Sequence, residues 1–398
     1  MTKKIEIQDL PLWEELSQKN IPFSFELELT ARCNNNCRHC YINLPAGDKQ
    51  AALRELTLKE IELIADQAAD LGSVWCLLTG GEPLLRSDFK DIYLMLKKKG
   101  FLINVFTNGC LINDHHIQLF KQYPPRDIEM TVYGVTQETY EAVTRVPGSF
   151  KTFQRGLDLL LSNGIGVTLK AMALRSNQHE IAEISKFCRE KTKLPFRYDP
   201  MLHLRYDHDP IRNEEIKQER LDPKEIVALE ISDQVHFQSM QEKCDNLILP
   251  ESLSYEDCSL CEKVKNCEEY KVLSRLFQCG IGKSEFSISY NGQLRLCSSL
   301  SAPGTTFDLK TGSIREGLEF LSEKIWSMNT SSTAILKSCK SCNISNLCAW
   351  CPATAYLETG DLEGEVDFFC EIAHGRAAAL KNALSSKLQV KDSVSTGR

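Results

Sequence analysis

Three cysteines stand close together near the N-terminus, in the order Cys33-Asn-Asn-Asn-Cys37-Arg-His-Cys40. Three thiolates on one short loop suit an iron–sulfur cluster, whose irons are held by cysteine sulfur. No fourth cysteine follows nearby, so one iron of a four-iron cluster would keep an open coordination position. The alternatives are structural cysteines or an incomplete zinc site, and zinc is a poor match because its structural sites close with four ligands. The spacing therefore predicts an iron–sulfur site.

Three further segments stand at the C-terminal ends of predicted strands, where barrel enzymes place their functional residues. They are Gly80-Gly81-Glu82-Pro83 at the end of the second strand, Thr107-Asn108-Gly109 at the end of the third, and Thr131-Val132-Tyr133-Gly134 at the end of the fourth. Each segment alone is typical of a turn. Their shared position behind parallel strands assigns them to the same site as the cysteine loop.

The loop, with Tyr41 directly after Cys40, resembles the C-x3-C-x2-C signature of radical S-adenosylmethionine (SAM) enzymes, which follows the first barrel strand. The resemblance implies that Cys33, Cys37 and Cys40 bind a 4Fe–4S cluster whose open iron is chelated by SAM. Reductive cleavage of SAM would then give a 5′-deoxyadenosyl radical that abstracts a substrate hydrogen. The residues that the resemblance assigns to SAM binding are Tyr41, Gly80, Gly81, Glu82, Pro83, Thr131 and Arg145. Asn177 fits either a polar residue of that site or a helix N-cap, and the N-cap is favoured.

A second group of cysteines fills the C-terminal part, where ten of the 17 cysteines lie between Cys258 and Cys370. The pattern is Cys279-x12-Gly292-x4-Cys297, then Cys339-x2-Cys342-x5-Cys348-x2-Cys351, then Cys370. It resembles the SPASM extension of radical SAM enzymes, except that two residues instead of three precede Cys351. The resemblance implies two auxiliary 4Fe–4S clusters, an outer one on Cys339, Cys342, Cys348 and Cys370 and an inner one on Cys279, Cys297, Cys351 and Cys267. An open inner site, a separate metal site on Cys258, Cys261 and Cys267, and zinc ribbons are the alternatives.

The elements that must position these residues alternate between strand and helix along the first half of the chain. Strands are expected at 23–30, 74–79, 101–107, 127–133, 165–174 and 195–204, and helices at 58–71, 87–99, 113–123, 150–163 and 177–192. This alternation predicts an α/β protein with a parallel sheet and right-handed crossovers. Six repeats are too few for a closed eight-fold barrel of ~250 residues. We therefore expect a partial (β/α)6 TIM-like barrel followed by a small cysteine-rich SPASM domain that binds iron–sulfur clusters, with a flat doubly wound sheet as the alternative.

Five consecutive segments are expected: an N-terminal extension at 1–22, a radical SAM core domain at 23–234, a cysteine-containing bridge at 235–278, a SPASM domain at 279–385 and a frayed tail at 386–398. The charged segment 203–224 is interpreted as the exit linker of the core. No stretch free of Asp, Glu, Lys and Arg reaches the ~18 residues that a membrane-spanning helix needs. A net charge of −7 argues against non-specific binding to nucleic acid, and the absence of a signal-peptide pattern predicts a cytoplasmic protein.

Together these features predict an enzyme that cleaves SAM reductively and abstracts a hydrogen from its substrate. SPASM relatives often modify peptides, so the resemblance implies a peptide or protein side chain as the substrate and a flavodoxin- or ferredoxin-type protein as the reductant. Neither nucleic acid nor a membrane is expected as a partner. The alternatives are a radical SAM oxidoreductase that acts on a small molecule or tetrapyrrole, and a non-catalytic iron–sulfur protein for electron transfer.

Overall fold

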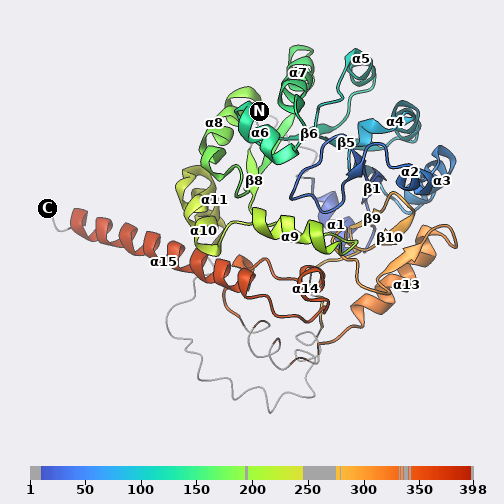
Figure 1. Ribbon diagram of the computed structural model, residues 1–398. Helices are drawn as coiled ribbons and strands as arrows, with labels where there is room; N and C mark the ends of the chain where they lie inside the picture. Colours follow the sequence, from blue (N-terminus) through green and yellow to red (C-terminus); the bar gives the residue numbers. More distant parts are fainter. Residues whose placement is uncertain are drawn as a thin grey trace, which may run out of the picture. The chain divides into compact units, whose positions relative to one another are not determined.

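The computed structural model describes residues 10–192, 196–244, 275–277, 279–330, 332, 335, 339 and 342–395 (Figure 1). Packing divides the chain into two compact units. The first unit comprises Met1–Arg220 and Gln278–Ile325, and the second comprises Leu221–Phe277 and Trp326–Arg398. This grouping differs from the five consecutive segments expected from the sequence, whose boundaries remain predictions.

The first unit is built on a parallel sheet. Its six strands in chain order are β1 (Ser24–Thr30), β4 (Trp75–Gly80), β5 (Leu102–Thr107), β6 (Asp127–Thr131), β7 (Thr168–Met172) and β8 (Arg197–Asp199). Each strand pairs in parallel with the next one in this order. Phe25, Leu27 and Leu29 of β1 are at most 1% exposed, so every second side chain of this strand enters the hydrophobic core.

The strand order decides between the two expected architectures. A doubly wound sheet reverses its strand order at a switch point, whereas β1-β4-β5-β6-β7-β8 follows the sequence without a reversal. Right-handed crossovers without a reversal place every connecting helix on one face. These helices lie on the outer side of the strands (Figure 1): α3 (Leu58–Asp70), α4 (Phe89–Lys98), α5 (Asp114–Gln122), α7 (Ser149–Ser162) and α8 (Ile181–Thr192). The predicted partial barrel is confirmed, and the doubly wound alternative is wrong.

Three more strands extend the same sheet beyond the six that the sequence predicts. Strand β9 (Glu285–Ile288) pairs in parallel with β1, and β10 (Gln293–Arg295) and β11 (Thr306–Asp308) follow as antiparallel neighbours. Helix α13 (Ile314–Trp326) comes next, and its first backbone N–H donates to Gln67 Oε1 of α3 at 2.7 Å. The first part of the expected SPASM segment therefore packs as an edge of the barrel sheet.

Several short elements escape the sequence analysis. They are α1 (Leu12–Gln18), α2 (Lys49–Arg54), α6 (Gln137–Thr144) and α9 (Pro210–Glu219), together with the parallel pair β2 (Arg32–Cys33) and β3 (Leu44–Pro45). The interpretation of 203–224 as a linker is wrong, because α9 lies within it. The start of α9 follows ordinary rules: Asp209 accepts from the N–H groups of Ile211 and Arg212, and Pro210 occupies the first turn.

The second unit is helical in its described residues. Its elements are α10 (Pro223–Ser232), α11 (Gln234–Cys244), η6 (Ser345–Leu347), α14 (Pro352–Thr359) and α15 (Asp367–Ser395), the last of which continues into the segment expected as a tail. Arg376 of α15 forms an ion pair with the buried Glu230 of α10 at 2.6 Å. A small core of Leu347, Ala373 and Leu380 lies beside it. Among the described residues of both units, no helix has the length and apolar character needed to cross a membrane.

Candidate active site

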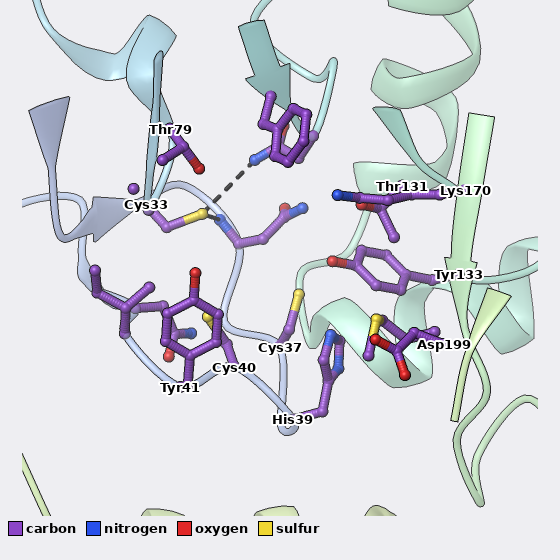
Figure 2. Close-up of a pocket in the computed structure, with 18 of the residues that line it drawn as sticks. Cys33, Cys37, His39, Cys40, Tyr41, Thr79, Thr131, Tyr133, Lys170 and Asp199 are labelled. Carbon is purple, nitrogen blue, oxygen red and sulfur yellow. Dashed lines mark hydrogen bonds between the residues drawn. The ribbon is translucent and has the colours of Figure 1, made fainter. Parts of the chain in front are cut away.

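The carboxyl ends of the parallel strands surround a cavity of about 270 Å³ in the first unit. Cys33, Cys37 and Cys40, called the loop cysteines below, line one side of it. Side chains from β6 to β8 and the segment after β6 line the opposite side, among them Thr131, Tyr133, Lys170 and Asp199 (Figure 2). This volume is near the lower end of ordinary ligand pockets, roughly 300–1,000 Å³. The site that the sequence predicts is therefore a real concavity.

The loop cysteines are held by two short strands that pair with each other: Cys33 is the last residue of β2, and β3 begins at Leu44, after Cys37 and Cys40. Burial raises the pKa of all three thiols, and for Cys33 the Glu82 carboxylate adds to this effect. Cys33 Sγ accepts from the Asn35 N–H at 3.4 Å and from Asn108 Nδ2 at 3.6 Å. Three sulfurs that face one cavity, with N–H donors at one of them, fit the thiolate ligation of an iron–sulfur cluster. In the described part of the chain, no three Cys, His, Asp or Glu side chains converge on a point that would hold a single metal ion.

Gly80 and Gly81 at the end of β4, called the glycine turn below, lie against the backbone that leads into the cysteine loop. A Cβ on Gly80 would stand 2.2 Å from Thr30 O, and one on Gly81 would stand 2.3 Å from Arg32 O. The Gly81 N–H donates to Thr30 O at 2.7 Å, and Gly80 has a φ of +122°. Only glycine allows this approach. Both glycines also line the cavity, so the turn joins the end of β4 to the loop and leaves its backbone open to a ligand.

Glu82 and Pro83 do not line the cavity. The Glu82 side chain is fully buried behind the glycine turn and accepts from Thr107 Oγ1 and the Asn108 N–H, both at 2.7 Å, and from the Leu84 N–H at 3.1 Å. Burial raises its pKa to about 7, against the lowering effect of these hydrogen bonds. Pro83 begins the short helix η2 (Pro83–Leu85) and is likewise buried. In this structure Glu82 joins the ends of β4 and β5, a scaffold role that the sequence analysis did not foresee.

Of the other three residues that the resemblance assigns to SAM binding, two line the cavity and one does not. Thr131 and Tyr41 line the cavity, and the Tyr41 ring lies 5.0 Å from that of Tyr206, centroid to centroid. Arg145 does not line it. Its guanidinium pairs with Glu215 of α9 at 2.7 Å and donates to the backbone oxygen of Asn36 at the same distance. Arg145 thus contacts the cysteine loop from outside the cavity.

Charged residues on the wall opposite the cysteines were missed by the sequence analysis. Lys170 of β7 forms a close ion pair with Glu129 of β6 and lies 3.9 Å from the centre of the Phe106 ring. Glu129 also pairs with Arg197 at 3.1 Å, and Asp199 follows two residues later on β8. A polar residue at every second position of a strand was the available signal, since alternate side chains face the barrel interior. The cavity therefore has one cysteine-lined side and one charged side.

Asn177 occupies the N-cap position of η3 (Gln178–Glu180), the role that was favoured for it, but its side chain makes no capping hydrogen bond. Its buried carboxamide donates to Tyr133 O and Met172 O, each at 3.0 Å, and accepts from the Leu174 N–H at 2.8 Å. It joins the segments that leave β6 and β7 and does not line the cavity.

In the second unit, Cys339, Cys342, Cys348 and Cys370, called the outer cysteines below, line one cavity of about 310 Å³. Burial raises the pKa of the Cys348 thiol, and the other three thiols add to this effect. The structure thus brings together the four residues that the resemblance assigns to the outer cluster, on segments up to 31 positions apart in the chain.

The residues expected for the inner cluster do not share one unit. Cys279 is exposed and Cys297 is half-buried in the first unit, whereas Cys351 is the N-cap of α14 in the second. Cys351 Sγ accepts from the Thr354 N–H at 3.4 Å. Cys258, Cys261 and Cys267 lie outside the described residues. The inner cluster remains a prediction.

Two of the curated proteins that match part of this chain are a heme synthase and a bacteriocin biosynthesis protein. The AdoMet-dependent heme synthase of Nitratidesulfovibrio vulgaris is 27% identical over 161 residues, which cover 40% of this chain and 43% of the relative. The antilisterial bacteriocin subtilosin biosynthesis protein AlbA of Bacillus subtilis is 28% identical over 180 residues, which cover 45% of this chain and 39% of the relative. The chain therefore spans less than half the length of these curated relatives.

A solved structure and a family model complete the comparison. Streptococcus suis SuiB bound to the precursor peptide SuiA has a TM-score of 0.62 at 17% identity, over 90% of this chain and 78% of SuiB. At this identity the likeness shows a shared fold, and it extends beyond the barrel. The model of the Radical SAM superfamily matches residues 27–188, which include most of β1, the loop cysteines, the glycine turn and the ends of β4, β5, β6 and β7. Residues 27–188 of this chain therefore form a Radical SAM domain.

Proposed function

We propose that this protein is a radical SAM enzyme that abstracts a hydrogen from a peptide or protein side chain. One observation carries the proposal: the loop cysteines, the glycine turn and Thr131 reach a single cavity from the carboxyl ends of different strands. These residues come from three separate stretches of the first half of the chain. Active sites of barrel enzymes are assembled in this way.

Each group has a defined task in this proposal. The loop cysteines hold a 4Fe–4S cluster in their thiolate form, so that binding the cluster releases the protons that the buried thiols otherwise keep. When bound, the cluster and SAM supply the electron transfer and the radical chemistry. The backbone of Gly80 and Gly81 and the hydroxyl of Thr131 line the space beside the cysteines, where SAM would bind. Glu82 holds the ends of β4 and β5 in register behind that space.

A peptide substrate is supported by the fold and by one relative. SuiB, which shares the fold, was solved with a precursor peptide, and AlbA acts in the biosynthesis of a bacteriocin. The charged wall of Glu129, Lys170 and Asp199 offers both signs of charge to the polar backbone and side chains of a peptide. The heme synthase relative favours a second candidate, a tetrapyrrole or another small molecule as the substrate.

The outer cysteines support an auxiliary 4Fe–4S cluster in a SPASM domain, because all four line one cavity. An inner cluster on Cys279, Cys297, Cys351 and Cys267 belongs to the same proposal. A flavodoxin- or ferredoxin-type protein would deliver the electrons.

The first experiment asks whether the protein cleaves SAM. The anaerobically reconstituted protein with SAM and dithionite should form 5′-deoxyadenosine, and replacing the three loop cysteines with Ala should abolish this. Cys188→Ala is the matched control, since Cys188 is a buried cysteine of α8 that does not line the cavity. Cleavage at the wild-type rate in the triple variant would refute the proposal, whereas a wild type that does not cleave SAM would leave the non-catalytic alternative.

The second experiment separates the two substrate classes. Short peptides encoded beside the gene for this protein and an iron tetrapyrrole are each incubated with the reduced enzyme and SAM. The proposal expects a change in peptide mass, detected by mass spectrometry, together with increased 5′-deoxyadenosine formation. An increase with the tetrapyrrole alone would instead support the small-molecule candidate.

A further inference from the structure

Three arginines hold the cysteine loop on the side that faces away from the cavity. Arg145 Nε donates to Asn36 O at 2.7 Å, and Arg212 Nη2 donates to Cys37 O at 2.8 Å. Arg205 Nη1 donates to Asn43 O at 3.2 Å and more weakly to Cys40 O at 3.4 Å. Four backbone oxygens between positions 36 and 43 therefore accept from guanidinium groups. Arg205 and Arg212 come from the segment that the sequence analysis interpreted as a linker.

The three guanidinium groups are well shielded from solvent and linked to one another. The side chain of Arg205 is 3% exposed, that of Arg212 17% and that of Arg145 22%. Glu215 of α9 pairs with Arg145 at 2.7 Å and with Arg212 at 2.6 Å, so one carboxylate bridges two of the arginines. Arg205 pairs with Asp207, whose side chain is half exposed. Asp209 also acts on the charge of Arg205, so the nearby carboxylates equal the arginines in number. The guanidinium groups are nevertheless the charges that contact the loop backbone directly.

This arrangement affects more than the shape of the loop. Reduction adds an electron, and thus a negative charge, to a cluster held by the loop cysteines. A fixed positive charge that lies close to the cluster and is partly shielded from water stabilises the reduced form of the cluster. It therefore raises the reduction potential of the cluster. We propose that Arg145, Arg205 and Arg212 are positioning residues that fix the cysteine loop and raise the reduction potential of its cluster. The proposal rests on the proposed function, since it requires that the loop cysteines bind a redox-active cluster.

Two substitutions at the same point of the network separate this electrostatic role from a merely structural one. Arg212→Gln removes a positive charge and keeps a side chain that can donate to Cys37 O. Glu215→Gln removes the negative charge that faces Arg145 and Arg212 and keeps a similar shape. A structural role predicts that both variants disturb the loop in the same way. An electrostatic role predicts shifts of opposite sign.

The experiment is a redox titration of the reconstituted full-length protein, followed by electron paramagnetic resonance. The relevant signal is the one that is missing from the variant in which the loop cysteines are replaced with Ala, and iron content is measured in parallel. Arg212→Gln should shift the midpoint potential to more negative values, and Glu215→Gln should shift it to more positive values. Lys217→Gln, a loss of one positive charge at an exposed position of α9, should leave it unchanged.

Unchanged potentials, or shifts of equal sign in Arg212→Gln and Glu215→Gln, would overturn the proposal. If Arg212→Gln takes up no iron, Glu215→Gln decides alone: a more positive potential supports the proposal, and an unchanged or more negative potential overturns it. A wild-type protein without this signal would refute the proposed function itself, which is a distinguishable result.

Discussion

Replacing Glu82 with Ala should destabilise the protein before any ligand is bound. The carboxyl group is fully buried and is the acceptor for three donors: Thr107 Oγ1, the Asn108 N–H and the Leu84 N–H. Each buried donor left without an acceptor costs about 1–3 kcal/mol. Because such costs are not additive, we expect the free energy of unfolding of Glu82→Ala to fall by about 3 kcal/mol at pH 5. At that pH the carboxyl group is protonated in the folded state.

The cost of this substitution should shrink as the pH rises. The pKa of Glu82 is about 7 in the folded protein against 4.5 when unperturbed, because burial disfavours the charged form. Between these values the unfolded chain ionises while the folded chain stays protonated, so the wild type loses stability as the pH rises from 4.5 to 7. The difference of 7 − 4.5 units at 1.36 kcal/mol per unit is about 3 kcal/mol. Glu82→Ala lacks this loss, so its disadvantage should be much smaller at pH 8 than at pH 5.

Urea unfolding of the metal-free protein at pH 5 and pH 8, followed by circular dichroism, measures both effects. Glu60→Ala is the control, because Glu60 is a solvent-facing glutamate of α3 that accepts from the Thr57 N–H at 2.7 Å. Loss of this capping bond should cost at most about 1 kcal/mol and should not shrink toward pH 8. The reasoning would be refuted if Glu82→Ala unfolded like the wild type at pH 5 while SAM binding was lost. Glu82 would then serve the ligand, as the sequence analysis expected.

Three further outcomes are expected. Glu28→Gln should flatten the fall in stability between pH 4.5 and 7, since burial raises the pKa of Glu28 to about 7; an unchanged pH profile in urea unfolding would contradict this. Lys170→Met should lower the free energy of unfolding by about 2 kcal/mol, because it leaves the buried Glu129 with only the exposed Arg197, and adding Glu129→Gln should restore part of the loss. Replacing the four outer cysteines with Ala should remove about four irons and four sulfides per chain. The spectroscopic signal of the cluster on the loop cysteines should remain. Zinc in place of that iron in the wild type would refute the SPASM assignment.

Much of the fold followed from local patterns. The apolar alternation of β1, the capping box at Thr57 and the glycine after α3 each depend on neighbours within a few positions, so their elements agree with expectation to within a few residues. The prediction for segment 203–224 was wrong because its many charged residues are typical of a solvated linker. In the folded chain, Arg205 and Arg212 have partners more than 160 positions away, in the cysteine loop. No local pattern reports such a pairing.

The sequence by itself indicated which residues could carry the chemistry: three cysteines on one loop, two glycines at the end of a strand, and a family signature that joins them. Ligand spacing and turn geometry are properties of short segments, so they can be read without a fold. Only the tertiary structure decided which side chains face the cavity. In the folded chain Glu82 and Arg145 do not line the cavity, whereas Lys170 and Asp199 line the wall opposite the cysteines. Strands β9, β10 and β11 extend the barrel sheet. Each of these outcomes depends on pairing between strands and helices that are distant in the chain, where burial and charge balance select the arrangement.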